Sequence, residues 1–194
     1  MNNKIKELIA SSISVKEKLL QDETLLQTLD TVVQVISDAF AAGNKVLFCG
    51  NGGSAADAQH LAAEFSGRFY KNRRALPAEA LHCNTSYLTA VANDYSYDVI
   101  YARLLDGIGF KGDVILGFST SGNSVNIIKA FEVARERGIV TIGLTGETGG
   151  DLKALSDYLF NVPSTITPRI QESHILLGHI ICELVEEKVF APIP

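Results

Sequence analysis

Apolar residues recur at helical spacing through the first forty residues of the chain. Spacings of three and four residues place such positions on one face of a helix. The apolar positions that follow this spacing are Ile5, Leu8, Ile9, Ile13, Leu25, Leu26, Leu29, Val32, Val33, Ile36 and Phe40. The pattern predicts two amphipathic helices that end near Gly43, ahead of the first strand.

A unit of strand, glycine-containing loop and helix then occurs twice. The apolar run KVLFC (45–49) precedes the loop GNGGS and a helix-compatible stretch from 55 to about 66. The run DVILGF (113–118) precedes the loop STSGNS and an amphipathic stretch over 125–137. Further strand-like runs lie at 140–144, at 158–162 and, more weakly, at 78–81. Alternating strands and helices favour an α/β fold, with a doubly wound five-stranded parallel sheet that helices cover on both faces.

The last predicted helix, from about Arg169 to Val189, is apolar around more than half of its circumference. Its apolar residues are Ile170, Ile175, Leu176, Leu177, Ile180, Ile181, Leu184 and Val185. One sheet face cannot cover so wide an arc, so we expect helices to pack between subunits of an oligomer. A small helical bundle closing within one chain is the alternative. We predict one domain over 1–194, with the helices of 1–42 used in oligomer packing and the α/β core and C-terminal helix over 43–194.

Composition and charge narrow the function classes. Of the 194 residues, 46% are hydrophobic and 20% are charged, which excludes a disordered chain. The 17 basic residues stand against 22 acidic ones, and no basic tract occurs. Because nucleic-acid binders carry a basic surface, we expect no nucleic-acid partner and a small-molecule ligand.

Cysteine usage and hydropathy predict the compartment. Cys49, Cys83 and Cys182 are an odd number without a CxxC pair, which argues against a disulfide framework and against a thiolate zinc site. Charged residues interrupt the apolar positions of the first twenty residues, and no later apolar run is long enough to span a bilayer. We therefore expect a cytoplasmic protein without a membrane partner.

The serine-rich loop 119–124 has the position and the chemistry of a phosphate site. In open α/β folds ligands bind at the carboxyl ends of the strands, where the next helix points its free N–H groups and the positive end of its dipole. Four hydroxyl groups add hydrogen-bond donors, so a phosphate monoester can be held without a lysine. They belong to Ser119, Thr120, Ser121 and Ser124. The simpler interpretation is that Ser124 caps the helix and the rest of the loop forms a turn.

The first loop and the helix after it offer a second set of contacts. The glycines of the loop let its backbone approach a ligand closely, and Asn51, Gly52 and Gly53 face the same crevice as the serine-rich loop. On the following helix, His60 and Glu64 are four residues apart and project from one face, so both can ligate one metal ion. A hydrogen-bonded surface pair is the simpler interpretation of this spacing.

The final helix carries three further candidates, Gln171, His174 and His179. Gln171 and His179 are separated by about 12 Å along the helix axis and by about 80° around it. They can share a metal centre only if His179 leans toward the helix N-terminus and Gln171 bends to meet it; otherwise they come from different subunits. His174 points in another direction, and we interpret it as a structural or supporting histidine.

Glu64 and His179 form a suitable pair for proton transfer. A carboxylate can take a carbon-bound proton, and an imidazole can serve the neighbouring oxygen. An aldose–ketose isomerisation needs both steps. Asn93 and Asp94, at an expected helix end, can bind sugar hydroxyl groups, although a capping turn is the interpretation that the sequence alone favours.

Five segments together carry a family resemblance. In chain order they are CGNGGSAADAQHLAAEFSGRF, ANDY, GFSTSGNS, LTGETGG and RIQESHILLGH. They resemble the sedoheptulose 7-phosphate isomerase (phosphoheptose isomerase) family of the sugar isomerase (SIS) fold group, whose sheet is flavodoxin-like. STSGNS alone indicates only a SIS domain, whereas CGNGGS, the pair of His60 and Glu64, and RIQExH followed by His179 narrow the resemblance to this branch.

The resemblance implies an activity, a cofactor and an assembly. The activity is conversion of sedoheptulose 7-phosphate to D-glycero-D-manno-heptose 7-phosphate through an enediolate. This reaction is the first step of heptose nucleotide biosynthesis for bacterial surface glycans such as lipopolysaccharide. The implied cofactor is Zn²⁺, and the implied assembly is a homotetramer with active sites between subunits.

The resemblance also implies roles for individual residues. The implied zinc ligands are His60, Glu64, Gln171 and His179. The implied catalytic acid/base pair is Glu64 and His179. The implied substrate-binding residues are Asn51, Gly52, Gly53, Glu64, Asn93, Asp94, Ser119, Thr120, Ser121, Ser124 and Gln171. Pro168 departs from the family pattern, which often has a small or acidic residue there, so no role is carried over to it.

Two alternative functions stay open at this point. Some SIS relatives, including a replication-initiator-associating protein, act as non-catalytic binding modules, but they lack equivalents of Glu64 and His179. An isomerase of another sugar phosphate is the second alternative, because the motifs report phosphate binding and proton chemistry rather than the length of the sugar.

Overall fold

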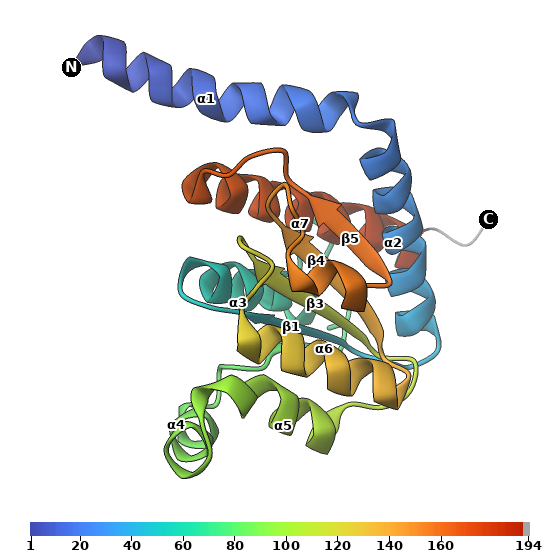
Figure 1. Ribbon diagram of the computed structural model, residues 1–194. Coiled ribbons are helices and arrows are strands. Elements are labelled where there is room, and N and C mark those ends of the chain that lie inside the picture. The colour runs from blue at the N-terminus through green and yellow to red at the C-terminus, as the bar shows by residue number, and fades with distance from the viewer. Residues whose placement is uncertain (192–194) are drawn as a thin grey trace.

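In the computed structural model, which describes residues 1–191, five strands form one parallel sheet in the order β2-β1-β3-β4-β5 (Figure 1). The strands are β1 (Val46–Gly50), β2 (Ala78–Ala80), β3 (Val114–Ser119), β4 (Val140–Thr145) and β5 (Tyr158–Asn161). The predicted doubly wound parallel sheet is confirmed, and each predicted strand agrees with the observed one to within one residue at each end. The strand order is that of flavodoxin-like folds.

Within residues 1–191, seven α-helices connect and cover the strands. They are α1 (Asn2–Gln21), α2 (Glu23–Ala41), α3 (Gly53–Ser66), α4 (Thr85–Asp94), α5 (Ile100–Ile108), α6 (Val125–Arg137) and α7 (Thr167–Val189). Short 3₁₀ turns occupy η1 (Tyr97–Val99) and η2 (Asp151–Leu155). The expected helices correspond to α1, α2, α3, α6 and α7, whereas the sequence pattern predicted no bounds for α4 and α5.

Two hydrophobic cores lie on opposite faces of the sheet. Within β1, Val46 and Phe48 face the core built with α2, α3 and α7, while Leu47 faces the core built with α5 and α6. Successive residues of a strand point to opposite faces. Because both faces are buried, the strands are apolar throughout instead of alternating.

Helix α1 runs beyond the body of the molecule, and its N-terminal half is poorly covered (Figure 1). Only Val15 and Leu19 of α1 are buried. Large apolar side chains along the same helix remain exposed: Ile5, Leu8, Ile9, Ile13 and Leu20. A bundle closing within one chain therefore leaves this apolar face open to solvent.

The carboxyl ends of β1 and β3 meet where the chain order of the strands reverses. From β1 the sheet continues to β2 on one side, and from β3 it continues to β4 and β5 on the other. Open α/β sheets bind ligands in the crevice at such a point. The loop GNGGS follows β1 and the loop STSGNS follows β3, so both predicted ligand loops lie at this crevice.

Two sequence predictions concern the chain as a whole. The predicted single domain spans 1–194, and its last three residues lie outside the described residues. Across residues 1–191, no helix combines the length and the apolar character needed to cross a membrane.

Candidate active site

The loop after β1 is hydrogen-bonded to the helix α6 and to the 3₁₀ turn η1. Asn51 and Asn126, at the start of α6, exchange two amide hydrogen bonds: Asn51 Nδ2 donates to Asn126 Oδ1 at 2.9 Å, and Asn126 Nδ2 donates to Asn51 Oδ1 at 2.8 Å. The Tyr97 hydroxyl also donates to Asn51 Oδ1, at 3.2 Å. The side chain of Asn51, predicted to bind substrate, thus also holds this loop against α6. Sequence reasoning missed Asn126 and Tyr97, although an asparagine two residues after a serine-rich loop was a usable signal.

The serine-rich loop after β3 is held in one conformation by its own side chains and by a neighbouring turn. The hydroxyl oxygens of Ser119 and Ser124 are hydrogen-bonded at 2.9 Å, and Ser121 Oγ accepts from the Asn123 N–H at 3.1 Å. Gly122 has φ +72°, and a Cβ there would lie 2.0 Å from the Gly149 carbonyl oxygen. Only glycine satisfies both conditions.

The simple interpretation of Ser124 as a helix cap is wrong. Ser124 is the N-cap residue of α6, but its side chain makes no capping hydrogen bond and pairs with Ser119 instead. The N–H groups of the first turn of α6 therefore receive no side-chain cap. Such a helix start, with its positive dipole end, is a favourable place for an anion.

A cavity of about 310 Å³ opens beside the serine-rich loop. Its lining comes from three segments, with residues Thr120, Ser121, Asn123, Gly146, Glu147, Thr148, Ser164, Thr165, Thr167 and Ile170. The volume lies at the small end of the range for ligand pockets, about 300–1,000 Å³. Thr148, Thr165 and Thr167 line this cavity, and sequence reasoning did not single them out. The density of serine and threonine in the segment 163–167 was the signal for two of them.

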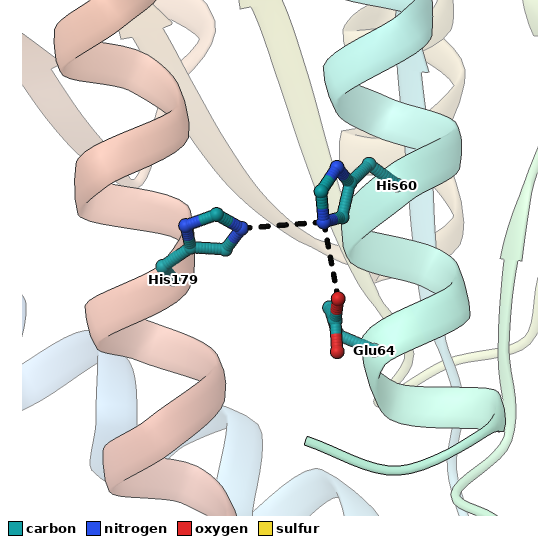
Figure 2. Close-up of side chains that lie close together, drawn as sticks. All are labelled: His60, Glu64 and His179. Carbon is teal, nitrogen blue, oxygen red and sulfur yellow. Dashed lines mark hydrogen bonds and ion pairs between the residues drawn. The ribbon is translucent and has the colours of Figure 1, made fainter. Parts of the chain in front are cut away.

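His60, Glu64 and His179 converge between α3 and α7. Figure 2 shows His60 and Glu64 on one helix and His179 pointing toward them from the other. His60 Nε2 lies 3.0 Å from Glu64 Oε1 and 3.3 Å from His179 Nε2. One ligand atom from each residue lies within 4.8 Å of the other two. The predicted pairing of two distant stretches of sequence therefore occurs within a single chain.

The electrostatics of this cluster favour a neutral imidazole at His179. Burial lowers the pKa of His179, the nearby His60 lowers it further, and Glu64 opposes both effects. The Phe69 ring, whose centroid lies 5.9 Å from that of His179, contributes to this burial. A neutral imidazole has one donor and one acceptor nitrogen, so it can carry a proton between two oxygens or ligate a metal.

The donor set fits a zinc ion. Two imidazoles and one carboxylate are common protein ligands of zinc, and three protein ligands leave a coordination position open in catalytic sites. Among residues 1–191, His60, Glu64 and His179 form the candidate metal-binding group.

The side chain of Gln171, in the first turns of α7, lies against Gly53, the first residue of α3. A Cβ built on Gly53 would lie 2.8 Å from Gln171 Nε2. Gly53 precedes His60 by about two helical turns, roughly 10 Å along the axis of α3. The Gln171 amide thus faces the backbone of the first loop, which suits contact with substrate. Its role as a zinc ligand stays a prediction.

His174 has a structural environment. It is fully buried, its Nε2 lies 3.1 Å from the Thr145 carbonyl oxygen, and burial lowers its pKa to about 4. The neutral ring therefore donates from Nε2 and joins α7 to the end of β4. This environment agrees with the expectation of a structural histidine.

Asn93 and Asp94 lie exposed at the C-terminal end of α4, the expected helix end. Asn93 Nδ2 donates to Asp94 Oδ1 at 2.9 Å, and within residues 1–191 their side chains make no other hydrogen bond. Their predicted contact with substrate stays a prediction.

Comparison with known proteins places the chain in a family. The model of the SIS domain family matches residues 10–146. The phosphoheptose isomerase of Aneurinibacillus thermoaerophilus is 55% identical over 190 residues, covering 98% of this chain and 96% of that protein. Phosphoheptose isomerase 2 of Campylobacter jejuni subsp. jejuni is 52% identical, covering 98% and 94%.

Solved structures agree with the sequence relatives. The structure of a phosphoheptose isomerase from Neisseria gonorrhoeae superposes with a TM-score of 0.90 at 40% identity, covering 96% of this chain and 98% of that one. A phosphoheptose isomerase from Francisella tularensis gives a TM-score of 0.91 at 34% identity, covering 95% and 97%. The resemblance expected from the sequence motifs is thereby confirmed. The chain belongs to the SIS domain family and, within it, to the phosphoheptose isomerases.

Proposed function

We propose that the protein is an aldose–ketose isomerase that converts sedoheptulose 7-phosphate to D-glycero-D-manno-heptose 7-phosphate. Membership of the phosphoheptose isomerase family supports the activity. The observation that carries the chemistry is the convergence of Glu64 and His179, whose ligand atoms lie within 4.8 Å of each other. The product is a heptose phosphate of the kind that begins heptose nucleotide biosynthesis for bacterial surface glycans.

The serine-rich loop binds the phosphate group of the substrate in this proposal. Its uncapped helix start and its hydroxyl groups supply N–H and O–H donors to a dianion. The hydroxyl groups belong to Ser119, Thr120, Ser121 and Ser124. The first loop, through Asn51, Gly52 and Gly53, and the neighbouring Gln171 bind the sugar chain, and Asn93 and Asp94 contact its hydroxyl groups.

Glu64 is the base that moves the carbon-bound proton. Its carboxylate removes a proton from C1 of the ketose, next to the carbonyl carbon C2, and an enediolate forms. The proton then returns to C2, while His179 carries the hydroxyl proton from O1 to O2. The carbonyl group finishes at C1, and the reaction consumes no other reactant. The lowered pKa of His179 supports this role, because a neutral ring has an acceptor nitrogen that can take the hydroxyl proton when it does not ligate the ion.

His60, Glu64 and His179 hold a zinc ion in this proposal, with Gln171 as the fourth ligand. When bound, zinc supplies positive charge that polarises the oxygens of the substrate. Glu64 has two carboxylate oxygens, so its carboxylate would be able to serve both as a ligand of the ion and as the base. His60 acts only as a metal ligand in this proposal and moves no proton.

The exposed apolar face of α1 supports a homotetramer with active sites between subunits. Ile9 and Ile13, with Ile5 one turn earlier, keep about half of their surface exposed in the single chain, at 56%, 51% and 49%. Contiguous exposed apolar surface of this kind marks interaction sites. Three free cysteines, two of them buried, support a reducing cytoplasmic compartment.

An assay with purified protein tests the proposal. Sedoheptulose 7-phosphate is supplied to protein as purified, to protein treated with a chelator, and to chelated protein with zinc restored. We expect product with the first and third samples and a strong loss with the second, and metal analysis should find zinc in the first. Absence of product in all three favours the non-catalytic binding module. Faster turnover of fructose 6-phosphate or ribulose 5-phosphate favours an isomerase of another sugar phosphate.

A further inference from the structure

A buried ion pair lies near the cluster of His60, Glu64 and His179, called the acid/base cluster below, without belonging to it. Arg73 Nε donates to Glu186 Oε1 at 2.7 Å, and each side chain is only 2% exposed. Removing two charges from water is unfavourable unless further hydrogen bonds satisfy both groups. These hydrogen bonds connect α7 with the end of α3 and with the segment that follows α3.

Glu186 holds the segment that follows α3. Its carboxylate accepts the backbone N–H groups of Phe69, Tyr70 and Lys71 at 3.0, 2.7 and 2.8 Å. Burial alone would raise the pKa of Glu186, but these three N–H groups and Arg73 outweigh it, so the pKa lies below its usual range. The carboxylate therefore stays ionised, and it holds residues 69–71 against α7.

Arg73 covers the C-terminal end of α3. Arg73 Nη2 donates to the Glu64 carbonyl oxygen at 2.8 Å, and Nη1 donates to those of Phe65 at 2.8 Å and Gly67 at 3.2 Å. A basic side chain near a helix C-terminus stabilises the last carbonyl groups in this way. The turn of helix that presents Glu64 is therefore bonded to the same guanidinium that binds Glu186.

Arg73 and Glu186 are each connected to one member of the acid/base cluster: Arg73 to Glu64 on α3, and Glu186 to His179 through α7. Glu186 follows His179 by about two turns of α7, and the segment it holds brings the Phe69 ring to within 5.9 Å of the His179 ring. We propose that Arg73 and Glu186 are positioning residues that set the spacing of Glu64 and His179. This inference rests on the proposed isomerase function and extends it to residues that touch neither substrate nor metal.

A matched control separates positioning from general stability. Asp113, directly before β3, has a carboxylate that is also buried, with 2% exposure, and also pairs with a cation, Lys45. It accepts the N–H groups of Lys45 at 3.0 Å and of Phe110 at 2.8 Å. Asp113→Asn therefore removes a buried negative charge whose hydrogen-bond partners within residues 1–191, Asn44, Lys45 and Phe110, lie outside α3 and α7.

The experiment compares Glu186→Gln, Asp113→Asn and the wild-type protein as full-length chains. Urea unfolding gives stability, initial rates with sedoheptulose 7-phosphate give kcat and KM, and calorimetric titration of metal-free protein with zinc gives a Kd. For Glu186→Gln we expect kcat to fall at least about 10-fold and the zinc Kd to rise about 10-fold, since supporting residues of metal sites have effects of this size. KM should change less than about 3-fold, because the serine-rich loop is untouched.

Asp113→Asn should lower the urea midpoint by a similar amount and leave kcat and the zinc Kd unchanged. Equal losses of kcat in both variants would overturn the proposal, because stability would then explain them. Wild-type kcat and zinc affinity in Glu186→Gln would also overturn it. If the wild-type protein does not isomerise the substrate, the proposed function fails. The positioning role is then tested by the zinc Kd alone: a Kd in Glu186→Gln equal to that of the wild-type protein would overturn it.

Arg73→Lys keeps the test valid if Glu186→Gln does not fold. Lysine retains the positive charge, but its single nitrogen cannot pair with Glu186 and also reach the three carbonyl groups at the end of α3. We expect a folded protein with reduced kcat and weaker zinc binding. Wild-type values of both quantities in Arg73→Lys would overturn the proposal.

Discussion

His60 Nε2 and His179 Nε2 lie 3.3 Å apart, although 119 residues separate them in the chain. The contact exists because α3 and α7 pack side by side on the same face of the sheet. Two imidazolium ions at this distance would repel each other, and His60 accordingly helps to lower the pKa of His179 after the larger effect of burial. The arrangement favours neutral nitrogen ligands, which is the form that binds a metal.

Replacing His60 by Asn should weaken zinc binding by at least about 10-fold, because one of three clustered ligands is lost. Stability of the metal-free protein should change little, since the His60 side chain is 50% exposed. Calorimetric zinc titration measures the first quantity and urea unfolding the second. His82→Asn is the control, because His82 lies outside the cluster. Unchanged zinc affinity in His60→Asn would remove this residue from the metal site.

Replacing Glu64 by Gln should lower kcat by about 10²–10⁴-fold, the range expected for loss of a general base. Substrate affinity should change little, because the phosphate group is bound by the serine-rich loop on other elements. Rates are measured with zinc present in excess, and substrate binding by calorimetry. Glu187→Gln, at an exposed position of α7, is the control. Turnover retained in Glu64→Gln would mean that another group removes the C1 proton.

The sequence predicted the sheet well because its signals are local. Apolar runs such as 45–49 and 113–118 stand out from their glycine-rich loops, and the spacing of His60 and Glu64 follows from helix geometry alone. Ala78–Ala80 gave a weak signal because β2 is short and lies at the edge of the sheet.

The candidate site was harder to predict because its contacts join distant segments. From helix geometry we could derive only the condition under which Gln171 and His179 share a centre, and the contact of Gln171 with Gly53 appears only in the structure. The pairing of Asn51 with Asn126, and of Arg73 with Glu186, depends on how α3, α6 and α7 pack. No local pattern in the sequence carries that information, whereas the family resemblance carried the joint role of Glu64 and His179.

Replacing Gly122 by Ala should disrupt the phosphate loop. An alanine Cβ would lie 2.0 Å from the Gly149 carbonyl oxygen at φ +72°, so the backbone of one loop must move. Strain of this kind costs about 1–3 kcal/mol, and we expect KM to rise at least about 10-fold as the hydroxyl groups lose their alignment. Gly107→Ala in α5, where a Cβ meets nothing within 4 Å, is the control and should leave KM unchanged. A wild-type KM in Gly122→Ala would show that the loop does not bind the phosphate.

Stability should fall as the pH is lowered below the ordinary pKa of His174. In the folded protein its pKa is lowered from 6.5 to about 4, so the unfolded chain binds a proton that the folded chain does not. The loss begins near the unfolded pKa, reaches about 2 kcal/mol at pH 5 and levels off below the folded pKa. Urea unfolding of the wild-type protein and of His174→Gln at pH 7 and pH 5 measures it. Between pH 7 and pH 5 the wild-type protein should lose more free energy of unfolding than the variant. Equal losses would contradict the lowered pKa of His174.

The exposed face of α1 should control the oligomeric state. Ile9 is 56% exposed in the single chain, so Ile9→Asp should fold normally, whereas an aspartate buried between subunits would leave a charge without a partner. Sedimentation should show a smaller assembly for Ile9→Asp than for the wild-type protein at the same concentration. Lys6→Asp, on an exposed position one turn away, is the control and should keep the wild-type mass. If active sites form between subunits, the specific activity of Ile9→Asp should also fall on dilution and recover on concentration. An unchanged sedimentation coefficient for Ile9→Asp would exclude this face from the interface, and the apolar surface of α7 around Leu184 would then be the next to test.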